Sequence, residues 1–246
     1  MFVLLFGSLI RGCGLSTTPL GGLSMPVRII NQNNNFLLEG SSRGFLLTID
    51  CSEQIRRYNS SIDLLQTDCR LYQDFAGIDN QNNLSLAIDN LIHSYGLHRR
   101  PVFNGNTLSP ILIEYLENIR TLPFANNNSL SIISERFVYL RNILTERLNR
   151  NSKLPEVTLS KLLHFINPNS FGIIDSRVNS IIEICGYRAS YNGFYEFLRD
   201  LMEDINYDAF SNLVLALNQE QMQQNNFNMP NHLLKIIDKV LWFTNE

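Results

Sequence analysis

The sequence predicts a mainly α fold, and three observations support this prediction. Apolar residues recur at i, i+3, i+4 and i+7 along most of the chain, which is the period of a helix with one buried face. Convincing strand patterns are few. The 246 residues, of which 44% are hydrophobic, can bury a substantial core in one large domain or in two lobes. We therefore expect about eight or nine helices.

The first 24 residues are interpreted as a leader or a non-native start that lies outside the fold. Residues 1–10 are apolar, but the run is too short to span a membrane and lacks the positive start of a secretory signal. Residues 12–24 are rich in Gly, Ser, Thr and Pro, which makes Met25 a candidate start of the folded protein.

The chain from 25 to 106 is expected to contain helices at 52–75 and 84–95, where apolar residues have helical spacing. Between 36 and 49, two Leu-rich pieces allow either two short strands or irregular structure. Gly96 ends the second helix, because glycine readily adopts the conformation that closes a helix C-terminus. The loop that follows contains the basic run His98-Arg99-Arg100.

The later helices follow from the same period and are separated by loops rich in Asn, Gln or Pro. Pro110 suits the first turn of the next helix, which begins at Thr107 or Ser109 and ends before the loop 123–128. Outside the central joint described next, the remaining helices are expected at 129–150, 190–205, 207–221 and 230–243.

Residues 158–185 are predicted to form two short helices joined by a turn. The first helix carries the apolar stripe Leu159, Leu162, Leu163 and Ile166, and Pro168 ends it, because proline disfavours helical dihedrals in the residue before it. Asp175 stands at the N-cap position of the second helix, and Gly186 closes that helix. The second stripe consists of Val178, Ile181, Ile182 and Cys185.

Composition and motifs narrow the classes of function. The formal charge of -3 and the pI of about 5.8 count mildly against a nucleic-acid binder, although they leave room for a local basic face. The four cysteines are far apart and form no metal-type spacing with histidine, so neither a zinc site nor a disulfide framework is expected. The separated cysteines therefore favour a reducing, cytoplasmic setting. No metal or cofactor is expected, and neither a nucleotide-binding motif nor the Gly-x-Ser-x-Gly motif occurs.

The string SKLLHFINPNSFGIIDSRV, residues 160–178, resembles bacterial 8-oxoguanine DNA glycosylase-like proteins, which belong to the helix-hairpin-helix DNA glycosylases. The closing LLKIIDKVLWF is similar to the C-terminal helix of such proteins. The resemblance implies a two-lobed helical glycosylase-like fold, with lobes placed at 25–125 and 126–246. It also implies a monomer that acts on double-stranded DNA, with no membrane partner, and flips a base out of the duplex.

The resemblance further implies that Lys161 attacks the sugar C1′ as an amine and forms a Schiff base, while Asp175 stabilises the positive charge that develops on the sugar. An attacking amine must be neutral, which requires burial or a nearby cation. The alternative for Lys161 is a solvated lysine, because it lies opposite the apolar stripe of its helix. Asp175 is also a simple N-cap, and the two roles are compatible.

Six further residues are candidates for contact with DNA or the flipped base. His164 lies one turn after Lys161, and its alternative is a hydrogen-bonded structural histidine. Phe165 and Phe171 stack on a base or pack in the core, and Arg177 contacts phosphate or forms a surface salt bridge. Arg99 and Arg100 grip the DNA backbone or are solvated.

Two classes of function follow. The first is a DNA glycosylase, with or without lyase activity, that removes an oxidised or otherwise modified base in repair or in defence against modified foreign DNA. The second is a non-catalytic helical protein that binds nucleic acid or a partner protein.

Overall fold

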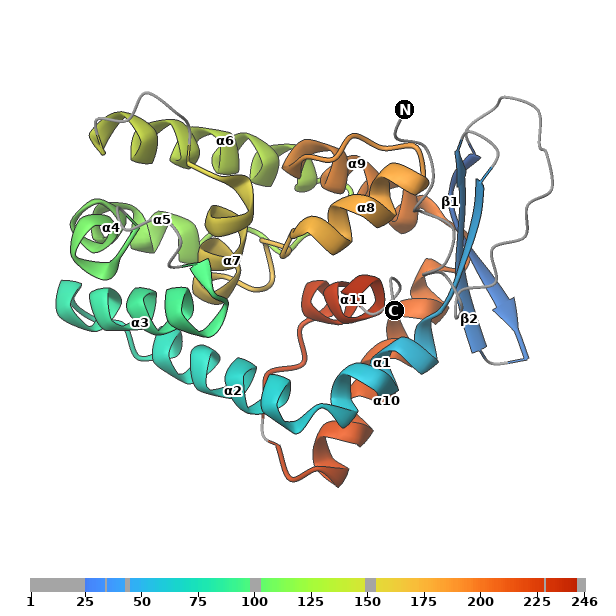
Figure 1. The fold of residues 1–246 in the computed structure, drawn as a ribbon. Coiled ribbons are helices and arrows are strands. Elements are labelled where there is room, and N and C mark those ends of the chain that lie inside the picture. Colours follow the sequence, from blue (N-terminus) through green and yellow to red (C-terminus); the bar gives the residue numbers. More distant parts are fainter. Residues whose placement is uncertain are drawn as a thin grey trace, which may run out of the picture. The chain divides into compact units, whose positions relative to one another are not determined.

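The computed structural model describes residues 25–33, 35–42, 45–97, 103–148, 154–227 and 229–242. The predicted mainly α class is confirmed (Figure 1). The described residues form α-helices α1 to α11, a 3-10 helix η2 and one small sheet. The leader predicted at 1–24 and the basic residues Arg99 and Arg100 lie outside the described residues.

The chain divides into two compact units that do not follow the predicted lobes, 25–125 and 126–246. Unit 1 consists of the described residues up to Ser60, Ile174–Gln221 and the chain from Ile236, and unit 2 of Ser61–Ile173 and Met222–Lys235. Each unit is assembled from stretches that are distant in the sequence, whereas the predicted boundary assumed one continuous stretch for each lobe. The division between Ile173 and Ile174 falls inside the predicted central joint.

Unit 1 contains a three-stranded antiparallel sheet of order β1-β2-β3, formed by β1 (Met25–Gln32), β2 (Asn35–Ser42) and β3 (Phe45–Asp50). Alternate residues point to one buried face, as the two-residue period of a strand requires. The buried residues are Val27, Ile29, Phe36, Leu38, Leu47 and Ile49. Of the two alternatives for 36–49, the strand interpretation is confirmed. β1 was missed because its apolar run is short and ends in the polar stretch NQNNN.

The helices of unit 1 are α1 (Cys51–Ser60), α8 (Ser176–Ile184), α9 (Tyr191–Glu203), most of α10 (Tyr207–Gln224) and the later part of α11 (Leu233–Trp242). α1 and α8 pack against β2 and β3, and α9 packs against β1. The approach is close at Gly40 of β2, where an added Cβ would lie 2.5 Å from the Cys185 Sγ. Gly40 therefore allows the C-terminal end of α8 to lie against the sheet.

Unit 2 contains α2 (Ile62–Ala76), α3 (Gln81–Ser94), α4 (Gly105–Leu112), η2 (Ile113–Tyr115), α5 (Leu116–Arg120), α6 (Leu130–Arg147) and α7 (Glu156–Ile166). α7 packs against α2 and α5. The helices outnumber the prediction because extended backbone at Ser61 interrupts the helix expected over 52–75. The helix expected before the loop 123–128 is likewise divided into α4, η2 and α5.

Both predicted glycine stops are confirmed. Gly96, after the C-cap of α3, has a φ of 61°, and Gly186, after the C-cap of α8, has a φ of 91°. The Gly186 N–H donates to the Glu183 carbonyl, and the Tyr187 N–H donates to the Ile182 carbonyl, as in a Schellman motif. Within the part of the chain that the structure describes, no helix is long and apolar enough to cross a membrane.

Candidate active site

The site begins with α7, which is buried on all sides. Every residue from Thr158 to Ile166 is buried, including Ser160, Lys161 and His164. The predicted stripe of α7 is therefore buried, but the opposite face of the helix is buried as well.

The turn after α7 is held by side-chain hydrogen bonds to the end of α5 and the loop beyond it. The Asn167 side chain donates to the Ile119 carbonyl at 2.8 Å, and the Ser170 hydroxyl donates to the Pro123 carbonyl at 2.7 Å. Asn167 is the C-cap of α7, so the predicted end of that helix before Pro168 is confirmed. These bonds fix the position of α7, and of the side chains that it carries, within unit 2.

Lys161 is buried, with 6% of its surface exposed, so the alternative of a solvated lysine is wrong. Its Nζ lies 4.3 Å from the centre of the Tyr95 ring. An ammonium over an aromatic face is stabilised by the ring quadrupole, and more strongly when both are desolvated. Tyr95 is the C-cap residue of α3, so this contact joins two helices of unit 2.

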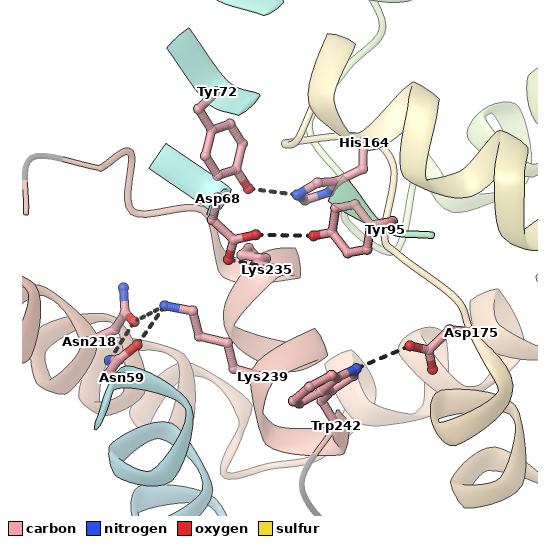
Figure 2. Close-up of polar contacts among 10 residues, drawn as sticks. All are labelled: Asn59, Asp68, Tyr72, Tyr95, His164, Asp175, Asn218, Lys235, Lys239 and Trp242. Carbon is pink, nitrogen blue, oxygen red and sulfur yellow. Dashed lines mark hydrogen bonds and ion pairs between the residues drawn. The ribbon is translucent and has the colours of Figure 1, made fainter. Parts of the chain in front are cut away.

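Tyr95 leads to a buried ion pair. Its hydroxyl donates to Asp68 Oδ1 at 3.0 Å, and Lys235 Nζ lies 3.2 Å from Asp68 Oδ2 (Figure 2). Both side chains of the ion pair are 2% exposed. We call Asp68, Tyr95, Lys161 and Lys235 the unit 2 cluster. It places two lysines and one carboxylate around one tyrosine, in an interior where charges require compensation.

His164 has the contacts of an interior histidine. Its Nδ1 lies 2.7 Å from the Phe171 carbonyl oxygen. Its Nε2 lies 2.6 Å from the Tyr72 hydroxyl (Figure 2). A carbonyl only accepts, so Nδ1 carries the proton and Nε2 accepts from Tyr72. Burial, and then the positive charge of Lys235, hold the pKa of His164 well below its ordinary value. These features fit the structural alternative for His164.

Phe165 and Phe171 likewise have the burial expected of core residues, at 3% and 0% exposure. The Phe165 ring lies 4.9 Å from that of Tyr72 and 6.1 Å from that of Tyr95, measured between centroids. Phe165 therefore supports the ring over which Lys161 lies. Core packing was the alternative interpretation of both residues.

Asp175 is the N-cap of α8, as predicted, and belongs to unit 1. Its Oδ1 accepts the backbone N–H groups of Arg177 at 2.9 Å and of Val178 at 3.0 Å. Its Oδ2 accepts the indole N–H of Trp242 at 3.1 Å (Figure 2). Both oxygens of this half-buried carboxylate are thus held in place.

Arg177 lies against an aromatic ring, and its contact with phosphate stays a prediction. Its guanidinium carbon lies 4.1 Å from the centre of the Trp242 ring. Trp242 is half-buried. It combines an apolar ring with an N–H group that bonds to Asp175, as tryptophans at the edge of a core commonly do.

The predicted catalytic residues fall in different units, Lys161 in unit 2 and Asp175 in unit 1, so their pairing stays a prediction. Sequence reasoning missed Tyr95, Asp68 and Lys235, which come from three separate elements. One local signal existed for Lys235, because α11 is strongly apolar and carries Lys235 and Lys239 one turn apart. Both lysines are buried, at 2% and 0% exposure.

Among the described residues, no group of three or more His, Cys, Asp or Glu side chains is placed to hold a metal ion. A scan against protein-family models, a search of curated proteins and a search of solved structures find no significant match for this chain.

Proposed function

We propose that this protein is a DNA glycosylase that removes an oxidised or otherwise modified base, in repair or in defence against modified foreign DNA. The observation that carries the proposal is the burial of Lys161, the residue that the family resemblance assigns as nucleophile. Lysines that react as amines are usually desolvated or lie near another cationic group. Lys161 is buried, and the unit 2 cluster to which it belongs contains a second lysine, Lys235.

In the proposed reaction the target base leaves the duplex, and the Nζ of Lys161 attacks C1′ of its sugar. A bond forms between Nζ and C1′, while the bond from C1′ to the base breaks and its electron pair leaves with the base, which takes up a proton. Loss of a proton from Nζ and opening of the sugar ring give a Schiff base. Hydrolysis of the Schiff base releases the lysine, and loss of the 3′ phosphate before hydrolysis would add lyase activity.

Asp175 has a separate role in this proposal, as the negative charge that stabilises the cationic sugar. A carboxylate suits this role when its orientation is set before the reaction, because no reorganisation is then needed in the transition state. Three N–H donors hold the Asp175 oxygens. We expect Asp175→Asn to lower the rate of base release about a hundredfold, the typical effect of removing one electrostatic group from an active site.

Borohydride trapping tests the nucleophile directly, because it reduces the Schiff base to a stable amine. The protein is incubated with a panel of duplexes that each carry one modified base, and adducts are mapped by peptide analysis. The sequence has four lysines, Lys153, Lys161, Lys235 and Lys239, so the assignment is between few candidates. We expect the adduct on Lys161, its loss in Lys161→Gln, and its retention in the matched control Lys153→Gln.

The outcomes separate the alternatives. Base release that survives in Lys161→Gln but is lost in Asp175→Asn would indicate a monofunctional enzyme without a lysine adduct. An adduct on another lysine would contradict the assignment of Lys161. If no duplex releases a base and binding to DNA shows no dependence on salt, the protein is not a glycosylase, and the partner-binding alternative gains support.

A further inference from the structure

Trp242 is the only tryptophan in the chain, and its indole N–H bonds to the carboxylate of Asp175. The backbone N–H groups of Arg177 and Val178 both donate to Oδ1 of Asp175. Neither of them bonds to Oδ2, so the position of Oδ2 depends on another donor. The indole N–H occupies one of the two lone pairs of Oδ2 and thereby sets the plane of the carboxylate.

The Trp242 ring is itself held by neighbours within unit 1. Arg177 lies over its face, and the Tyr58 ring meets it edge to face, with centroids 5.7 Å apart and planes at 70°. Asp175, the N-cap of α8, accepts the indole N–H, and Arg177, two residues later, lies over the indole ring. The start of α8 therefore contacts both the N–H group and the ring of the tryptophan. Because Arg177 and Tyr58 both contact the indole ring, the ring has little freedom to turn its N–H away from Asp175.

Tyr58 in turn contacts Lys239, a fully buried lysine one turn before Trp242 on α11. The Nζ of Lys239 lies 5.1 Å from the centre of the Tyr58 ring. It donates to the side-chain oxygens of Asn59 and Asn218, each at 2.8 Å (Figure 2). Lys239 is 0% exposed, and both asparagines are buried. A buried polar network with all its hydrogen bonds made is rigid. It therefore holds Tyr58 and α11 in place, and with them the position of Trp242 relative to Asp175.

We infer that Trp242 is a positioning residue, whose indole N–H orients the Asp175 carboxylate toward the substrate sugar. The inference rests on the proposed function, because it assigns to Asp175 the stabilising role in base excision. Trp242 acts only through Asp175 and takes no part in bond making. The orientation of the carboxylate matters because electrostatic stabilisation depends on the distance from the charge to the reacting carbon.

The first test measures the contact without any reaction. A ¹⁵N-labelled sample gives one indole N–H signal, since the chain has one tryptophan. Asp175→Ser keeps an oxygen that caps α8 but removes the oxygen that accepts from Trp242. We expect the indole proton to shift upfield and to exchange faster with water in this variant. The matched control, Asn80→Ser at the N-cap of α3, should leave the signal in place.

The second test measures the consequence for the reaction. Trp242→Phe keeps an aromatic ring and removes the N–H, and we expect single-turnover base release to fall about tenfold or more, the effect of losing one hydrogen bond to a charged group. The affinity for the duplex should stay within about twofold, because a rate effect without an affinity effect marks an interaction made in the transition state. Wild-type-like rates in folded Trp242→Phe would overturn the inference.

The two tests separate the failure of the inference from the failure of the proposed function. An indole signal that does not respond to Asp175→Ser overturns the inference, whatever the activity of the wild-type protein. A responsive signal in a wild-type protein that releases no base from any duplex overturns the proposed function, and with it the catalytic meaning of the contact.

Discussion

Replacing Asp68 with asparagine tests whether the buried ion pair stabilises unit 2. In the folded protein Asp68 Oδ1 accepts from the Tyr95 hydroxyl, and Asp68 Oδ2 lies 3.2 Å from Lys235 Nζ. Asparagine has nearly the same shape and keeps an oxygen that can accept from Tyr95. The substitution therefore removes the negative charge and leaves most of the packing and the tyrosine hydrogen bond intact.

The expected loss in the free energy of unfolding is about 3–5 kcal/mol, the usual result of removing one partner from a buried ion pair. The attraction between unit charges at 3.2 Å is about 5 kcal/mol at an effective dielectric constant of about 20, which agrees with that range. Such a loss is a large share of the roughly 5–15 kcal/mol that stabilises a typical domain.

Urea unfolding followed by far-ultraviolet circular dichroism measures the loss, with Lys235→Met and the double variant in the same series. We expect the double variant to lose less than the sum of the single variants, because removing both charges leaves neither buried without its partner. Two results would refute the view that each buried charge compensates the other. One is a loss below about 1 kcal/mol in Asp68→Asn, and the other is a double variant whose loss equals the sum of the two single losses.

Three further predictions concern stability. Burial lowers the pKa of His232 to about 4, so the unfolded chain binds a proton that the folded chain does not, and stability present above pH 6.5 is lost as the pH falls toward 4. After a discount for the partial exposure of this side chain, the free energy of unfolding should fall between these pH values by about 1–2 kcal/mol more in the wild-type protein than in His232→Gln. Gly40→Ala should cost about 1–3 kcal/mol in chemical unfolding, since its Cβ would meet Cys185 Sγ at 2.5 Å, and a Cys185→Ala background should recover part of that cost. Asp175→Ala should lower the thermal midpoint through the loss of about 1 kcal/mol of capping energy, whereas Asp175→Ser should retain most of it; equal midpoints for the two variants would contradict a capping role.

Local features of the central joint were predictable because they depend on neighbours in the sequence. Asp175 caps α8 through backbone groups two and three residues away, and Gly186 closes the same helix through bonds to its last turn. Because the residues that form these bonds are close in the sequence, the local sequence predicts them. The strands at 36–49 were only an alternative, and β1 was missed, because strands are stabilised by pairing with partners that a local pattern does not contain.

The candidate site was predictable only in part. The sequence indicated Lys161 through family resemblance, but its apolar stripe suggested an exposed lysine. The structure buries all of α7 from Thr158 to Ile166 and sets Lys161 over Tyr95. Tyr95, Asp68 and Lys235 come from α3, α2 and α11, so their convergence has no counterpart in local spacing.

The sequence by itself determined the helical class, the end of α7, and the cap and stop of α8, with Asp175 at the start of that helix. These follow from backbone hydrogen bonds and side-chain periodicity over a few residues. Only the tertiary structure decided that the lysines of α7 and α11 are buried, that Asp68 is paired with Lys235, and that Trp242 bonds to Asp175. Burial and long-range pairing depend on which distant segments fill the space around a side chain, and residue order alone does not contain that information.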